Sequence, residues 1–189
     1  MEDRRARKTK QALREGLAEL LYEKKLQKIT VKELVEKADI HRSTFYVNFH
    51  DIYDLYQHIE DVAIEEIKVI FQADYGLDDF YRAILKYVSE NKKTSGLFFN
   101  KIADNSFVDR LVELHLDSCI MNLHKEYGIN ITDEKLKPYM FPYITYCFSG
   151  SIAVIGKWIM GELPHSSEEI VEMLCGIDVK VGKQVVNML

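Results

Sequence analysis

One stretch decides the fold of this chain: TVKELVEKADIHRSTFYVNFHDIYDL, from Thr30 to Leu55. Its pattern predicts two short helices joined by a tight turn, followed by the start of a third helix. Thr30 and Glu33 have the spacing of a capping box, in which each side chain accepts a hydrogen bond from the other residue's backbone N–H. A helical apolar stripe follows, formed by Val31, Leu34, Val35 and Ala38. Asp39 then suits the turn, because Asp tolerates left-handed backbone angles better than most residues.

The second short helix is expected over residues 42–49, beginning at Arg42. Phe45 and Phe49 should face inward, because residues four apart share one helix face. The opposite face and its flanks then carry Ser43, Thr44, Tyr46, Val47 and His50. A short helix with such a polar and aromatic outer face suits base edges and phosphates in a DNA major groove. The alternative is an ordinary helical hairpin whose outward residues have no role.

These residues resemble the DNA-binding domain of the TetR/AcrR family of bacterial regulators. The matching positions are Thr30, Val31, Leu34, Val35, Ala38, Thr44, Phe45, Tyr46, Phe49, Asp54 and Leu55. The resemblance covers Arg5 to about Ile67, and the form A-D-I-x-R-x-T-F-Y is similar to a subgroup frequent in Gram-positive bacteria. Asp39, His41 and Ile52 stand where the commonest pattern has a Gly, a Ser and a phosphate-contacting Lys. The last change affects that phosphate contact rather than the fold.

A double-stranded DNA operator is therefore the expected partner. We expect the contacts to come from Thr30, Lys32, Arg42, Ser43, Thr44, Tyr46, Val47 and Asn48. Charge supports this locally, since residues 1–50 hold 12 Lys and Arg against 8 Asp and Glu, whereas residues 51–189 hold 13 against 22. The densest basic run is Arg4, Arg5, Arg7, Lys8 and Lys10, which either attracts phosphates or is simply a solvated helix end. The balance predicts a basic DNA-binding head on an acidic body.

The whole chain is expected to be all-α, with about nine helices. An N-terminal three-helix DNA-binding domain over residues 1–50 precedes a C-terminal helical bundle over residues 51–189, for dimerisation and ligand binding. Further helices are expected over residues 77–93, 94–102, 106–127, 138–162 and 167–187. Ser166 and Glu169 form a second capping box at the start of the last helix. No stretch alternates as a strand would.

Residues 139–160 contain a single charge, Lys157, and are long enough to span a bilayer. Pro and Gly interrupt them, so a buried helix is the preferred interpretation and no membrane is expected. This helix carries a small-residue stripe of Ser149, Ala153 and Gly156, and a bulky stripe of Phe148, Ile152, Ile155 and Ile159. The last helix has an apolar face of Ile170, Met173, Leu174, Ile177, Val181 and Val185. The resemblance implies that these two helices form a homodimer interface; the alternative is a core helix within a monomer.

No pattern indicates catalysis, so the chain is not expected to be an enzyme or to need a cofactor or metal. The histidines lack metal-ligand spacing, and His115 and His124 are expected at the surface. Cys119, Cys147 and Cys175 suit reduced thiols in the cytoplasm, with a redox sensor as the alternative.

The acidic body is rich in aromatic residues. Those that could line an apolar ligand pocket are Phe98, Phe99, Phe107, Tyr139, Tyr143, Tyr146 and Trp158. The alternative is that they form ordinary core. Many TetR-like proteins are released from DNA by a ligand in this region. The sequence thus predicts a homodimeric repressor that responds to a small-molecule inducer; the alternatives are an activator, or an interaction module controlled by a protein partner.

Overall fold

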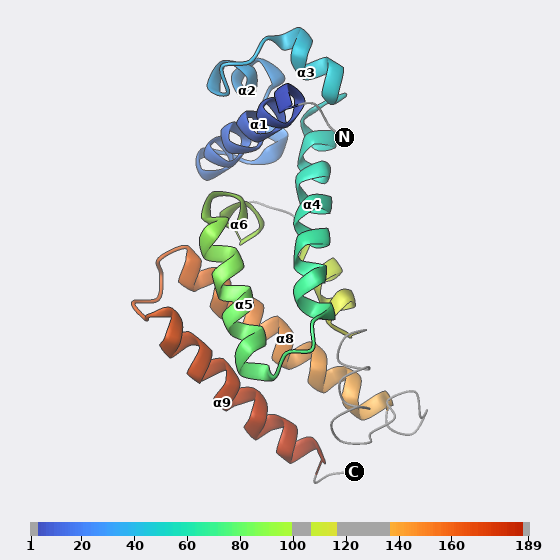
Figure 1. Ribbon diagram of the computed structural model, residues 1–189, viewed down its shortest axis with the longest axis vertical. Helices are drawn as coiled ribbons and strands as arrows, with labels where there is room; N and C mark the ends of the chain where they lie inside the picture. Colours follow the sequence, from blue (N-terminus) through green and yellow to red (C-terminus); the bar gives the residue numbers. More distant parts are fainter. Residues whose placement is uncertain (1–3, 100–106, 117–136, 187–189) are drawn as a thin grey trace. The chain divides into compact units, whose positions relative to one another are not determined.

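Helices form the chain, as the sequence predicts, in a computed structural model that describes residues 4–99, 107–116 and 137–186 (Figure 1). No strand occurs among these residues. The described helices are α1 (Arg4–Glu23), the short 3-10 helix η1 (Leu26–Lys28), α2 (Val31–Lys37), α3 (Arg42–Asn48), α4 (Ile52–Gln72), α5 (Leu77–Glu90), α6 (Lys92–Phe99), a helical segment over residues 107–116, α8 (Lys137–Ile159) and α9 (Ser167–Val186).

Two compact units divide the chain. The N-terminal unit contains residues 1–65 and 91–104, and the C-terminal unit contains residues 66–90 and 105–189. The N-terminal unit thus includes the first part of α4 and also α6, which packs against α1. The sequence analysis assigned residues 1–50 to DNA binding and residues 51–189 to dimerisation and ligand binding. This functional division remains a prediction.

The core of the N-terminal unit forms where α1, α2 and α3 meet. Its fully buried side chains include Leu13, Leu17, Leu34 and Phe45. Gly16 lies at the crossing of α1 and α2, where an added Cβ would come within 3.3 Å of the Ala38 Cβ. A side chain there would push the two helices apart, so glycine permits their close approach.

Backbone caps fix the start and end of α2. The Thr30 Oγ1 accepts from the Glu33 N–H at 3.2 Å, and the Glu33 carboxylate accepts from the Thr30 N–H at 3.0 Å, which confirms the capping box. Asp39 has a φ of +53°, as its turn position requires. The Ile40 N–H then donates to the Val35 carbonyl at 2.9 Å, which closes the helix with a left-handed cap.

The C-terminal unit packs α5 against both α8 and α9 (Figure 1). Its apolar core includes Leu85 from α5, Phe148 and Ile155 from α8, and Ile170 from α9. A polar cluster of Tyr81, Ser151 and Asp178 joins the same three helices. The Tyr81 hydroxyl donates to the Asp178 carboxylate at 2.5 Å and lies 2.8 Å from the Ser151 hydroxyl.

The helix boundaries differ modestly from those predicted. The expected helix over residues 77–93 ends at Glu90, and the next helix begins at Lys92. The capping box at the start of α9 is confirmed, since the Glu169 carboxylate accepts from the Ser166 N–H at 2.7 Å. Of the expected helix over residues 106–127, residues 107–116 are helical and the remainder lies outside the described part.

The two predicted stripes of α8 lie on different sides, with one exception. The bulky stripe is buried in full, whereas Ser149 and Ala153 of the small-residue stripe are exposed. Gly156 is buried, so its inclusion in an outward stripe is wrong. It lies at the border of the two stripes, near the point where the chain turns back towards α9. Within the described ranges, no helix has the length and apolar character to cross a membrane.

Candidate nucleic-acid interface

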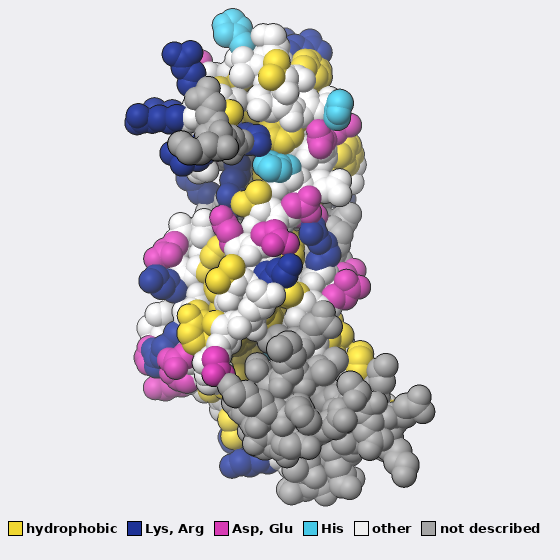
Figure 2. Space-filling view, turned by 45° about the vertical axis from the view of Figure 1, so that its right-hand side comes forward, with side chains coloured by type: hydrophobic (Ala, Val, Ile, Leu, Met, Phe, Trp, Pro, Cys, Tyr) yellow, Lys and Arg dark blue, Asp and Glu magenta, His cyan; other side chains and the backbone are white. Residues whose placement is uncertain are grey.

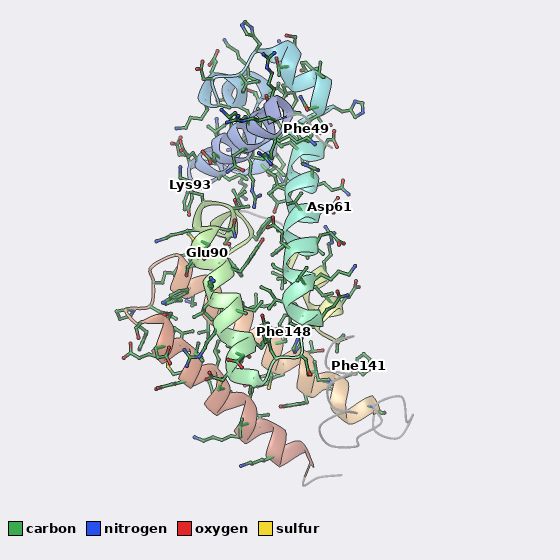
Figure 3. The ribbon with its side chains drawn as sticks, in the orientation of Figure 1. Phe49, Asp61, Glu90, Lys93, Phe141 and Phe148 are labelled. Atoms are coloured by element: carbon green, nitrogen blue, oxygen red, sulfur yellow. The ribbon has the colours of Figure 1, made fainter. Side chains whose placement is uncertain are left out.

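Helix α3 is anchored by aromatic residues on one side and open to solvent on the other. Phe45 is fully buried, and Phe49, labelled in Figure 3 at the end of the helix, is also buried. The predicted outward residues Ser43, Val47 and His50 are all exposed. The inward and outward faces of α3 are therefore oriented as the sequence predicts, and Arg42, Ser43, Tyr46 and Val47 are its exposed residues.

Arg42 and Tyr46 form a pair on this surface. The Arg42 Nη2 donates to the Tyr46 hydroxyl at 3.2 Å, and the guanidinium carbon lies 5.5 Å from the centre of the tyrosine ring. The Tyr46 ring in turn packs edge-on against Phe45 at 5.4 Å. Arg42 is thus held over a ring that is itself fixed by the core. The sequence analysis treated Arg42 and Tyr46 as two separate DNA contacts. Residues four apart on a helix are neighbours, so their spacing was a signal for the interaction between them.

Thr44 and Asn48 are less accessible than the other predicted contacts. Both are half-buried, and the Asn48 Nδ2 donates to the Thr44 carbonyl at 2.8 Å. This bond adds a side-chain donor to a carbonyl in the last turn of α3. Asn48 therefore stabilises the end of α3.

Thr30 and Lys32 are exposed at the start of α2. The Lys32 side chain is 78% exposed, and its amine lies 4.0 Å from the Glu36 carboxylate, a loose surface pair. Glu33 receives a closer contact from Lys24 at 2.5 Å. This Lys24 hydrogen bond, together with those from Thr30, lowers the pKa of Glu33 from 4.5 to about 2. The cap of α2 is consequently ionised at neutral pH.

Basic side chains project from the N-terminal unit, which forms the upper part of Figure 2. Arg4, Arg5, Arg7 and Lys8 are exposed at the start of α1, whereas Lys10 is half-buried. Exposed cations of this density attract a phosphate backbone regardless of sequence. The unit therefore combines a general electrostatic attraction with a short, exposed helix.

Known proteins resemble the chain most clearly in its C-terminal part. The TetR_C_8 family, described as the C-terminal region of transcriptional regulators, matches residues 76–177, more than half of the chain. The chain belongs to the TetR family. No curated protein matches it.

Solved structures of TetR-type regulators share its fold along almost the full length. A regulator from Syntrophomonas wolfei is 18% identical, with a TM-score of 0.64 and 97% of each chain covered. A regulator from Streptococcus agalactiae is 21% identical, with a TM-score of 0.62, covering 93% of this chain and 96% of that one. The dihydroxyacetone kinase operon activator DhaS is 19% identical, with a TM-score of 0.61, covering 91% and 94%. At these identities the likeness shows the fold alone.

The aromatic residues predicted to bind a ligand are divided between the two units of this TetR protein. Phe98 is buried in the N-terminal unit, where its ring lies 6.4 Å from that of Tyr56. In the C-terminal unit, Phe107 is buried but Tyr146 is 72% exposed. The remaining described residues of the set are Phe99, Tyr143 and Trp158, all half-buried, and the Tyr139 side chain lies outside the described part. The ligand pocket remains a prediction.

Tyr143 and Trp158 have structural contacts of their own. The Tyr143 hydroxyl donates to the Asp178 carbonyl at 3.1 Å, and the Trp158 Nε1 donates to the His165 carbonyl at 2.8 Å. A separate surface groove of about 220 Å³ lies between α5 and α9. It is lined by Arg82, Leu85, Lys86, Ser89, Ser167, Glu168 and Val171, none of them predicted. Arg82 already pairs there with Asp78 and Glu168.

His115 lies inside an aromatic cluster, so the prediction of a surface position is wrong. Its imidazole stacks on Phe148, which is labelled in Figure 3, with ring centres 4.0 Å apart, and it meets Phe71 edge-on at 5.5 Å. Burial lowers the pKa of His115 to about 4, which keeps the ring neutral at pH 7. Helical periodicity places a residue on a face but does not say what covers that face. His124 lies outside the described residues.

Thiol chemistry finds little support in the C-terminal unit. Cys147 and Cys175 are half-buried and not in disulfides, and Cys119 lies outside the described part. Burial, with the nearby carboxylates, raises the pKa of both thiols to about 11, so neither is a thiolate at neutral pH. Across the described ranges, no group of His, Cys, Asp and Glu residues is arranged to hold a metal ion.

Proposed function

We propose that this chain is a homodimeric DNA-binding repressor that reads an inverted repeat, one half-site with each α3. The observation that carries the proposal is the exposed face of α3, where Arg42, Ser43 and Val47 point away from the Phe45 anchor. Membership of the TetR family supports it, since the family comprises transcriptional regulators rather than enzymes. The A-D-I-x-R-x-T-F-Y segment is part of the same proposal, as the mark of the Gram-positive subgroup.

Each exposed side chain has a proposed task. Arg42 suits a guanine, whose two major-groove acceptors match the guanidinium fork, and Ser43 beside it can donate to either kind of base. Thr30, Lys32 and Tyr46 suit phosphates, which set the register of the helix in the groove. Thr44 and Asn48 complete the set from the flanks of α3. The Arg42–Tyr46 pair would position the guanidinium before DNA arrives.

A mobility-shift titration on DNA flanking the gene, repeated at rising salt, tests DNA binding. We expect Arg42→Ala to weaken operator binding by about 1–3 kcal/mol and to relax preference at one base pair. Arg42→Lys is the matched control, because it keeps the charge and loses the fork. Tyr46→Phe should weaken operator and unrelated DNA alike. If Arg42→Ala and Tyr46→Phe both bind like the parent, α3 does not face DNA.

Dimerisation is proposed through the exposed apolar residues of α8 and α9. Tyr146 is 72% exposed, Ile177 51% and Met173 40%, and the exposed Ser149 and Ala153 would let a second helix approach closely. Such a surface on a folded chain suggests a partner surface.

Light scattering at micromolar concentration tests assembly. It should give about twice the chain mass of 22.1 kDa, and Ile177→Glu should give the monomer. Gly156→Leu is unsuitable as a dimer probe, because the buried Gly156 position would overpack the chain's own interior. If the parent protein is a monomer, it cannot bind both half-sites of an inverted repeat as a two-fold symmetric dimer, and this part of the proposal is wrong.

The direction of control and its signal are the remaining parts of the proposal. We propose repression, relieved by a small-molecule inducer in the C-terminal unit, in the cytoplasm. A structurally similar protein is named the dihydroxyacetone kinase operon activator DhaS, which keeps activation as the second candidate. Control by a protein partner is the alternative to a small-molecule inducer. A reporter gene placed behind the DNA that the protein binds distinguishes repression from activation. Deleting the regulator raises expression if it is a repressor and lowers expression if it is an activator.

A further inference from the structure

Val47 is 84% exposed, more than any other large apolar side chain in the described part of the chain. It lies in the last turn of α3, on the outward face. Valine is a weaker helix former than Ala, Leu or Lys because its branched side chain loses rotamer freedom in a helix. An exposed valine therefore weakens a seven-residue helix and gains nothing from burial. The stability of α3 does not explain the residue.

The neighbours of Val47 leave its methyl groups open. Ser43 lies four residues earlier on the same face of α3 and is small and exposed. Arg42 and Tyr46, the paired residues, form a second stripe beside the first. Two neighbouring pairs thus lie on α3: Arg42 with Tyr46, and the two short side chains Ser43 and Val47.

The short side chains of Ser43 and Val47 allow α3 to approach DNA closely. A helix with its side chains is about 10–12 Å across, and the major groove is about 12 Å wide, so side chains on the leading face limit how deeply a helix enters. Ser43 and Val47 are both short, which allows the backbone of α3 to come near the base edges. The one apolar group that the four standard bases present there is the C5-methyl group of thymine.

We propose that Val47 selects thymine by packing its methyl groups against the thymine C5-methyl group, once in each half-site. This inference rests on the proposed function, since it requires α3 to enter the major groove. Docking of a protein partner is the competing use of the residue. It is less favoured because Arg42, Ser43 and His50 around Val47 are polar, and the exposed Tyr46 ring is paired with the Arg42 guanidinium, so these residues do not extend the apolar surface into a patch.

The test begins with duplexes selected by the parent protein from a random double-stranded DNA library. Each thymine of a selected duplex is then replaced by deoxyuridine, which removes only the methyl group and keeps base pairing. We expect one position in each half-site at which the replacement weakens binding about three- to fivefold, the effect of one buried methyl group. The other thymines should tolerate the replacement.

The Val47→Ala variant links the effect to the residue. At the sensitive position, this variant should bind thymine and deoxyuridine duplexes equally. Val69→Ala is the matched control, because Val69 is 68% exposed on α4, outside the proposed contacts, and should retain the parent's preference. Circular dichroism checks that Val47→Ala keeps its helical content.

Different failures have different meanings. If the parent selects duplexes but is indifferent to deoxyuridine at every position, Val47 does not read thymine and DNA binding stands. If Val47→Ala keeps the parent's preference, another residue makes the contact and the inference is overturned. If the parent enriches no duplex at all, the proposed function fails with it, and a protein partner becomes the explanation for the exposed face.

Discussion

In the N-terminal unit, carboxylates accept hydrogen bonds at the surface, whereas in the C-terminal unit Asp178 accepts them between three helices. Hydrogen bonds from Lys24 and Thr30 lower the pKa of Glu33. Burial raises the pKa of Asp178 despite the bond from Tyr81. Hydrogen bonds thus favour the charged form of Glu33. In Asp178 a hydrogen bond is present as well, but the charged form is disfavoured. What differs is the loss of water around the carboxylate.

This contrast separates two uses of polar contacts. A surface cap defines where a helix begins at little desolvation cost. A buried contact fixes which side chains meet when helices pack, and it becomes costly when one partner is removed.

Replacing the half-buried acceptor Asp178 should have the largest effect. Tyr81 is 3% exposed, and Asp178→Ala removes the carboxylate that accepts from its hydroxyl, which keeps the contact with the Ser151 hydroxyl. We expect the free energy of unfolding to fall by about 2–3 kcal/mol. Urea denaturation measures the loss, and hydrogen exchange should place it in α5 and α9. Glu172→Ala on the exposed side of α9 is the control and should change little. A loss no larger than that of the control would show that the cluster adds no stability.

Removal of the surface cap should cost less. Thr30→Ala deletes the hydroxyl that accepts from the Glu33 N–H, with an expected loss of about 1 kcal/mol. Hydrogen exchange should report faster opening of α2 than of α9. Thr30→Ser keeps the hydroxyl and should retain most of the protection. Equal losses in both variants would assign the effect to the methyl group instead of the cap.

Acid should act on the two carboxylates with opposite signs. The folded-state pKa of Glu33 is below its ordinary 4.5, so its contribution is complete above pH 4.5 and is lost as the pH falls towards 2. The folded-state pKa of Asp178 is above its ordinary 3.8, so stability falls as the pH rises from 3.8 through the raised pKa. As the pH falls from about 5 to about 3, α2 should therefore become less stable and α9 more stable.

Hydrogen exchange across this pH range, corrected for intrinsic exchange rates, measures both trends. The change in α2 should be smaller than in Thr30→Ala, because the Thr30 hydroxyl still caps the helix when Glu33 is protonated. Glu33→Gln should abolish the acid sensitivity of α2. Parallel trends in α2 and α9 would contradict the contrast between the units.

The smallest effect is expected at an exposed carboxylate shared by two lysines. Glu19 lies 2.9 Å from the Lys37 amine and 3.4 Å from the Lys93 amine, and these contacts lower its pKa. All three side chains are solvent-exposed, so salt screens the attraction. Glu19→Gln should unfold like the parent at physiological salt and slightly earlier at low salt. A large, salt-independent loss would mean that Glu19 has a role beyond charge.

The local features of the fold were predictable because their signals lie within a few residues. The capping boxes, the turn at Asp39 and the inward positions of Phe45 and Phe49 each depend on spacings of three to five residues. Such spacings are set by helix geometry and survive any arrangement of the remaining chain. The outward face of α3, and with it the candidate DNA contacts, follows from the same geometry.

Long-range features were not predictable from the sequence. The Tyr81–Asp178 bond joins residues 97 apart in the chain, and no local pattern pairs them. His115 and Gly156 were misplaced because periodicity gives the direction of a side chain but not its neighbour. The predicted ligand residues were grouped by composition, so Phe98 was assigned with aromatics that belong to the other unit.

The place of α6 in the N-terminal unit has a consequence for the synthesis of the protein. Helix α1 packs against α6, and the Arg14 side chain donates to the Thr94 hydroxyl at 2.9 Å across this contact. Because chains emerge from the ribosome N-terminus first, α1 is complete about seventy residues before α6 is made. A fragment cut after α3 would lack this cover, leaving an apolar side of α1 in water. The N-terminal unit is therefore finished late in translation, although its first helices are the first to appear.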